Sequence, residues 1–159
     1  MDGLTHFDNE GRAKMVDVTD KPITSRVAIA SGKVVMKPET IRLVKDRALS
    51  KGDVLAVARV AAITGAKHTP FLIPMCHPLN ITSVTIDFSI NEELCCIDIL
   101  ATVKIIGQTG VEMEALTAAT VAALTIYDMC KAVDKQMVIK DVMLLEKHGG
   151  RGGNYKREN

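Results

Sequence analysis

A long stretch without a charged side chain lies in the second half of the chain. Thirteen uncharged residues, 115–127, separate a pair of acids from Asp128 and Lys131. Ala and Leu are abundant, and no Gly or Pro interrupts the segment after its first residue, so 110–131 predicts one helix. The uncharged span is too short to cross a bilayer, and we therefore expect a buried helix.

Two stretches alternate between apolar and polar positions. Residues 82–90 and 97–105 each predict a strand with one buried face, and the polar residues 91–93 between them predict the turn of a β-hairpin. The apolar positions of the pair are Val84, Ile86, Phe88, Ile90, Ile97, Ile99, Ala101, Val103 and Ile105.

Further elements flank these. Residues 26–36 and 137–145 have strand character, and a proline opens a short helix at 38–49. Asp53 is a suitable N-cap for a largely apolar helix, 54–67. Two nearly uncharged helices in one small domain suggest packing against a sheet and also against another subunit.

The order of these elements predicts the fold class. Strand, helix, strand, strand, helix, strand is the ferredoxin-like βαββαβ order of an α+β protein, here with an extra short helix in the first crossover. We expect an antiparallel sheet with helices packed on one face. The predicted organisation is a mobile N-terminal segment at 1–14, a single ferredoxin-like domain at 15–148 and a Gly-rich polar tail at 149–159.

Composition narrows the function classes. The chain has 159 residues, 47% of them hydrophobic, which excludes a largely disordered protein. Its net charge of +1, its 3% aromatic content and its lack of Trp give no support for nucleic-acid or membrane binding. The N-terminus lacks the apolar core of a signal peptide, and no apolar run reaches transmembrane length, so the expected location is cytoplasmic.

The four cysteines form no CxxC pair, and in a cytosolic chain they are expected to be reduced. Cys76, His77 and Cys130 can be imagined as zinc ligands, but their spacing does not favour a tetrahedral site. We therefore predict no protein-bound metal. For Cys95 and Cys96 we prefer the interpretation as strand residues at a hairpin edge.

The long helix has a geometric consequence. At 1.5 Å rise per residue, Glu114 and Asp128 lie about 21 Å apart along the helix axis. Because this separation is nearly four turns, the two side chains share a face. One small substrate can hardly contact both in one subunit, which suggests a site shared between the helix start of one subunit and the helix end of its neighbour.

Several polar clusters are candidates for chemistry. Lys51 precedes a helix start, a position that attracts phosphate. Asp128 and Lys131 are spaced for an ion pair and can be structural or act as acid and base. Two prolines stiffen the loop that holds Met75, Cys76 and His77; a proton-transfer or anion site and a rigid turn both remain open.

Other candidates lie near the chain ends and at the start of the long helix. Glu112 and Glu114 favour the helix dipole, and their spacing suggests that only one faces a pocket. Lys21 and Arg26 precede the first strand. The glycine-rich tail after Lys147 can wrap phosphates through its backbone amides, although it is not a Walker motif.

These motifs together resemble one family. The segments MVDVTDK, KGDVLAVARVA, IPMCHPL, TGVEMEALTAATVAALTIYDMCKAVDK and the tail after Lys147 look like cyclic pyranopterin monophosphate synthase, the protein C family of molybdenum cofactor biosynthesis. The resemblance implies a ferredoxin-like homohexamer, a trimer of dimers with pockets between subunits. It implies conversion of 3′,8-cyclo-7,8-dihydro-GTP to cyclic pyranopterin monophosphate with release of pyrophosphate.

The resemblance also assigns residues. It implies catalytic roles for Asp128, Lys51 and Lys131. The substrate-binding positions that it implies are Lys21, Arg26, Met75, Cys76, His77, Glu112, Met113, Glu114 and Lys147. It implies no protein-bound cofactor, and the one ion that it suggests is magnesium accompanying the substrate phosphates. In the tail the family's GGKSG is replaced by GGRGG, which keeps a charge and loses a hydroxyl.

Three other functions compete with the enzyme. A nucleotide-binding regulatory module has the same fold but needs no acid–base cluster. Zinc-dependent hydrolysis requires bound zinc. A purely structural subunit is the least favoured, because many charged residues interrupt the apolar pattern at loop and helix ends.

Overall fold

The structure, a computed structural model, describes residues 5–47, 49 and 52–158. Its elements follow the predicted order, with one addition near the C-terminus. They are β1 (Thr24–Val35), α1 (Pro38–Lys45), α2 (Val54–Leu72), β2 (Ile81–Asn91), β3 (Cys96–Gly107), α3 (Glu112–Cys130), β4 (Val138–His148) and β5 (Tyr155–Lys156).

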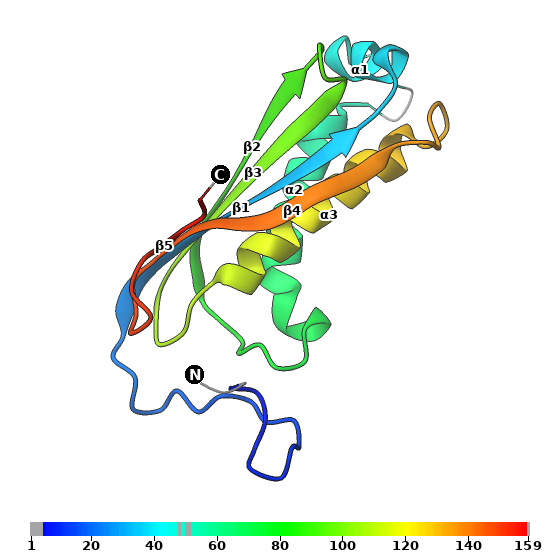
Figure 1. The fold of residues 1–159 in the computed structure, drawn as a ribbon. Coiled ribbons are helices and arrows are strands. Elements are labelled where there is room, and N and C mark those ends of the chain that lie inside the picture. The colour runs from blue at the N-terminus through cyan, green and yellow to red at the C-terminus, as the bar shows by residue number, and fades with distance from the viewer. Residues whose placement is uncertain (1–4, 48, 50–51, 159) are drawn as a thin grey trace.

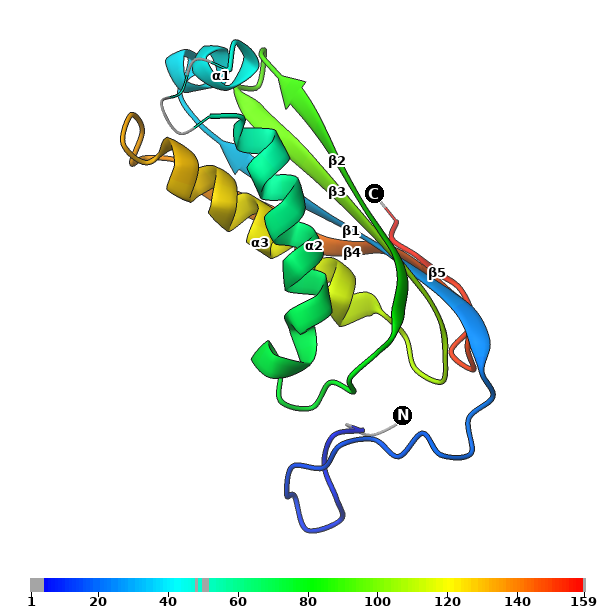
Figure 2. The ribbon, with the colours of Figure 1, turned by 180° about the vertical axis from the view of Figure 1, so that it is seen from behind.

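The strands form one antiparallel sheet in the order β2-β3-β1-β4-β5. Helices α2 and α3 lie side by side across one face of this sheet, and α1 lies at one end (Figures 1 and 2). Without β5 this is the strand order of a ferredoxin-like βαββαβ fold. The predicted fold class is confirmed.

Alternation along the strands places the core between sheet and helices. In β3, Ile97, Ile99, Ala101, Val103 and Ile105 are all buried, as predicted. On the helix side the core is built largely from alanines of α2 and α3, which lets the helices approach closely. A Cβ added at Gly65 of α2 would come within 2.8 Å of the Val121 Cγ2 of α3.

Several element bounds differ from the expectations, and one strand was not expected. Helix α1 ends at Lys45. The next residue, Asp46, is its C-cap, and the Asp46 N–H donates to the Arg42 carbonyl. Helix α2 begins as predicted, with Asp53 accepting a hydrogen bond from the Ala56 N–H, but continues to Leu72. Strand β5 was not predicted: its two residues, Tyr155 and Lys156, carry too little pattern to be recognised.

The residues before β1 form no long element. Phe7 and Ala13 make an isolated antiparallel bridge, and Asp8 closes the turn between them by accepting hydrogen bonds from the Glu10 and Arg12 backbone. The predicted mobility of this segment stays a prediction. So does packing of α2 and α3 against another subunit, although Val57, Val60 and Leu124 expose apolar side chains on these helices.

Candidate active site

A cavity of about 450 Å³ opens at the end of the sheet where α3 begins. Its walls come from the N-terminal segment, β1, the loop after α2, the start of α3 and the end of β4. All nine residues that the resemblance assigned to substrate binding line it, namely Lys21, Arg26, Met75, Cys76, His77, Glu112, Met113, Glu114 and Lys147.

Arg26 supplies a fixed positive charge in this cavity. The alternation of β1 places it on the same side as Ala28, and only 8% of the residue is exposed. Its Nε donates to the Gly107 carbonyl at 3.0 Å and its Nη2 to the Gln108 carbonyl at 2.9 Å. Because both partners are neutral, the guanidinium charge stays available to an anionic ligand.

Glu112 and Lys147 join the helix start to the end of β4. The Lys147 Nζ lies 3.0 Å from the Glu112 Oε1, and both side chains are about two-thirds buried. Gly110 makes room for this arrangement, because a Cβ at that position would collide with the Glu112 carboxylate. The glycine of the GVEME motif is therefore needed for the acid to fold back over its own helix start.

Glu114 is the unusual acid of the site. It is only 3% exposed, and burial raises its pKa to about 7, with the charge of Glu112 adding to the effect. Near neutral pH its carboxyl group can donate or accept a proton. The expectation that only one of the two acids faces a pocket is wrong, because the cavity wraps around the end of the helix and contacts its whole first turn.

The loop after α2 brings Met75, Cys76 and His77 to the cavity wall. It is non-helical, as its prolines predicted, and the Cys76 N–H closes a turn onto the Ile73 carbonyl at 3.1 Å. Burial raises the pKa of the Cys76 thiol, and the negative charge of Glu114 raises it further. Cys76 is therefore suited to packing against a ligand rather than to attack as a thiolate.

The remaining predicted residues lie elsewhere. Asp128 and Lys131 form the expected ion pair, with the Lys131 Nζ 2.6 Å from the Asp128 Oδ1, at the opposite end of α3. Their side chains are 59% and 53% exposed, so in the single chain this ion pair lies at the surface. The last turn of α3 buries Met129 and Cys130 instead. Lys51 lies outside the described residues.

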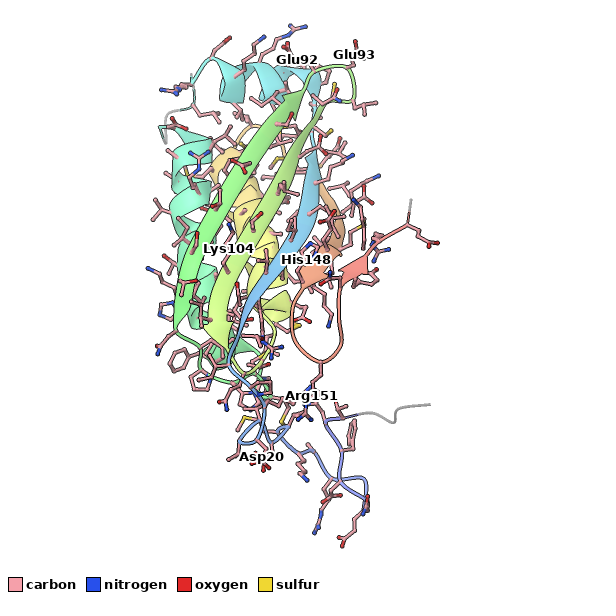
Figure 3. The ribbon with its side chains drawn as sticks, turned by 90° about the vertical axis from the view of Figure 1, so that its left-hand side faces the viewer. Asp20, Glu92, Glu93, Lys104, His148 and Arg151 are labelled. Carbon is pink, nitrogen blue, oxygen red and sulfur yellow. The ribbon has the colours of Figure 1, made fainter. Side chains whose placement is uncertain are left out.

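Sequence reasoning missed part of the cavity wall. The other lining residues were not assigned individually, although several lie in the quoted motifs, in the first predicted strand or in the glycine-rich tail. They are Thr5, His6, Val16, Val18, Val27, Leu79, Thr109, Gly110, His148, Gly149, Arg151 and Gly152. Figure 3 shows Arg151 and Asp20 at the cavity end of the molecule, with Glu92 and Glu93 at the other end. The glycine-rich tail after Lys147, which the sequence suggested as a phosphate-binding segment, contributes Gly149, Arg151 and Gly152 to this wall.

The zinc alternative has no geometric support. Cys76 lines the cavity with Glu114 of the first turn of α3, whereas Cys130 is the last residue of that helix. Within the part of the chain that the structure describes, no three His, Cys, Asp or Glu side chains gather around a common metal position. Over the same residues, no helix has the length and apolar character needed to cross a membrane.

Known proteins resemble this chain over nearly its full length. Cyclic pyranopterin monophosphate synthases of a Thermoanaerobacter strain and of Heliobacterium modesticaldum are 60% and 57% identical to it. These matches cover 98% and 99% of this chain and equal shares of theirs. That of Thermomicrobium roseum is 57% identical over 98% of this chain and 93% of its own. A solved structure of a ferredoxin protease FusC mutant with Arabidopsis ferredoxin matches at 13% identity and a TM-score of 0.32, over 65% of this chain and 10% of its own, too weakly to bear on the fold.

A family model described as the MoaC family matches residues 15–150, which include every described cavity residue from β1, the α2 loop, α3 and β4. With this match and relatives at 57–60% identity over nearly the whole length, the chain belongs to the MoaC family.

Proposed function

We propose that this chain is a cyclic pyranopterin monophosphate synthase of molybdenum cofactor biosynthesis. It converts 3′,8-cyclo-7,8-dihydro-GTP to cyclic pyranopterin monophosphate and releases pyrophosphate, which makes it a lyase. The observation that carries the proposal is the gathering of all nine expected binding residues around one cavity. The names of the full-length relatives support the same activity.

The charges of the cavity suit a triphosphate. Lys21, Arg26, Lys147 and Arg151 line it together, so several cations can meet the phosphates and the departing pyrophosphate. Closing the cyclic phosphate forms a bond from a substrate hydroxyl oxygen to the α-phosphorus and breaks the bond to pyrophosphate. The hydroxyl proton must pass to a base, and cations stabilise the charge that the leaving group gains.

Rearrangement of the purine-derived ring needs further proton transfers. Glu114, with its pKa raised to about 7, can hold or release a proton in the cavity near neutral pH. Asp128, Lys131 and Lys51 complete the proposed acid–base cluster. Because Asp128 and Lys131 lie at the far end of α3, we assign them to the cavity of a neighbouring subunit in a homohexamer, a trimer of dimers, located in the cytoplasm.

The cavity does not fit a protein-bound magnesium ion. Its carboxylates are Glu112, which is paired with Lys147, and Glu114, whose raised pKa disfavours the ionised ligand form. Magnesium would therefore arrive with the substrate phosphates. The chain's own cations would still provide the charge stabilisation described above.

The direct test is a single-turnover incubation with 3′,8-cyclo-7,8-dihydro-GTP, in which pyrophosphate release is followed. The wild type is expected to release pyrophosphate. Asp128→Ala and Lys51→Ala, checked for folding by circular dichroism, are expected to lose about a hundredfold or more in rate. If the wild type binds the compound and releases nothing, the chain is a binding module rather than this enzyme.

A further inference from the structure

The N-terminal arm, residues 5–23, forms one wall of the cavity. Its contributions to the wall are Thr5, His6, Val16, Val18 and Lys21. It runs outside the sheet and helices, below the body of the molecule in Figures 1 and 2. Phe7 and Ile23 are 50% and 68% exposed, whereas Val16 and Val18 are partly buried at the cavity wall, so apolar packing holds this arm only in part.

One side chain attaches the arm to the body. The Gln108 Nε2 donates to the Thr19 carbonyl at 3.1 Å and to the Lys21 carbonyl at 3.0 Å. Among the residues that the structure describes, no other hydrogen bond joins the arm to the rest of the chain. The arm's remaining bonds close its own turns, as when the Lys21 N–H donates to the Val18 carbonyl.

Gln108 is itself held rigidly. It lies in the loop between β3 and α3, four residues before Glu112, and its backbone carbonyl accepts the 2.9 Å bond from Arg26. The amide nitrogen of a glutamine carries two N–H groups, and here each meets one carbonyl of the arm. The arm, the buried arginine and the start of α3 therefore meet at this residue.

We propose that Gln108 is a positioning residue that fixes the arm so that Lys21 stays at the cavity and meets the substrate phosphates. The inference rests on the proposed function for its substrate. Gln108 acts through binding rather than through proton transfer, because the arm contributes Lys21 to the wall, whereas Glu114, the proton-transfer group of the cavity, is held by α3 and not by the arm. Loss of the Gln108 amide should therefore weaken substrate binding and leave the chemical step largely intact.

The test compares wild type with Gln108→Glu in the full-length protein. Glutamate has the same shape, but its carboxylate cannot donate and would face two carbonyl oxygens. With two hydrogen bonds lost, KM for 3′,8-cyclo-7,8-dihydro-GTP should rise about tenfold while kcat changes by less than about twofold. Trypsin should cut the exposed arm after Arg12 and Lys14 about tenfold faster, because loss of the two hydrogen bonds makes it easier for the arm to leave the body.

Two further variants make the result interpretable. Asn91→Asp makes the same amide-to-acid change at the far hairpin, where the side chain only accepts a bond from the Leu94 N–H, and it should leave both readouts unchanged. Gln108→Met removes both donors without adding charge and serves if the glutamate variant fails to fold. It should also raise KM and speed cleavage.

Unchanged KM and unchanged cleavage in both Gln108 variants would overturn the proposal, as would a fall in kcat with KM unaltered. If the wild type shows no turnover, the proposed enzyme activity fails. The trypsin comparison then decides by itself whether Gln108 holds the arm, because that readout needs no substrate.

Discussion

Lys131 and Asp128 are joined by a 2.6 Å ion pair at the C-terminal end of α3, at the opposite end of the helix from the cavity that Glu114 lines. The separation of 14 positions from Glu114 to Asp128 corresponds to about 21 Å of helix. An acid–base pair at that distance cannot act on a ligand in the cavity of its own chain. If both sets of residues serve one reaction, two chains must contribute to each site.

Subunit mixing tests this arrangement. Arg26→Ala disables the cavity, and Asp128→Ala disables the helix end, so each variant alone should be inactive in pyrophosphate release. When the two are unfolded together and refolded as a mixture, about a quarter of shared sites would combine an intact cavity with an intact helix end. Activity should therefore return to about a quarter of the wild-type level.

The control is each variant refolded alone, which should stay inactive. Recovery of activity in the mixture can come only from sites assembled between chains. A mixture that remains as inactive as its components, while size-exclusion chromatography shows mixed oligomers, would place the whole site within one chain.

The buried acid predicts a pH-dependent stability. Because the pKa of Glu114 is raised from 4.5 to about 7, the folded state holds this proton more tightly than the unfolded state. Stability is therefore lost as the pH rises from 4.5 through 7, by on the order of 3 kcal/mol at most. Glu114→Gln should be more stable than wild type at pH 8 and should lose this advantage at pH 4.

Urea unfolding at pH 4 and pH 8 measures this stability difference. It is followed by far-UV circular dichroism, since the chain has no Trp for fluorescence. Glu112→Gln is the matched variant. Glu112 lies two residues before Glu114, and its side chain is about two-thirds buried in an ion pair with Lys147. A stability difference for Glu114→Gln that does not change between pH 4 and pH 8 would contradict the raised pKa.

Asp134 caps a helix distant in the sequence. It is 1% exposed, and its carboxylate accepts the Lys37 N–H, the Gln136 N–H and the Thr40 hydroxyl. Burial by itself would raise the pKa of Asp134, but these hydrogen bonds outweigh it and hold the pKa below 3.8. Asp134→Ala should destabilise the protein by about 2–3 kcal/mol at pH 7.

The pH dependence of this effect has the opposite sign to that of Glu114. A lowered folded pKa means that the stabilisation is present above pH 3.8 and is lost as the pH falls through the lower folded value. Thermal unfolding of wild type and Asp134→Asn should therefore differ less at pH 2.5 than at pH 7. An equal difference at both values would show that the charge of Asp134 is not what the cap uses.

The close approach of Gly65 to Val121 predicts that substitutions at these two positions are energetically coupled. A methyl group at Gly65 would come within 2.8 Å of the Val121 Cγ2, and a β-branched side chain has little freedom to move away. Gly65→Ala should destabilise the protein by about 1–3 kcal/mol, despite the better helix propensity of Ala. The double variant Gly65→Ala/Val121→Ala should recover part of this loss, and chemical denaturation of all four proteins gives the coupling energy. Additive effects would mean that the helices do not touch there.

The strands and the long helix could be predicted because their patterns are local. β2 and β3 alternate over nine or more residues, and α3 has one uninterrupted uncharged run between its terminal charges. β5 could not be predicted, because Tyr155 and Lys156 become a strand only by pairing with Lys147 and Glu146 of β4. A strand of two residues has no periodicity that a sequence can reveal.

For the candidate site, the motifs around His77 and Glu114 indicated which residues would meet, and the resemblance connected them. Their environment is a property of the fold. Glu114 acquires its raised pKa from burial, and Asp134 becomes a cap because the fold brings it to Thr40, 94 residues earlier. The sequence by itself determined the order of elements and the residue types available for chemistry. Only the tertiary structure decided which acids leave water and that the N-terminal arm joins the cavity wall, because burial and the contact with Gln108 depend on segments far apart in the chain.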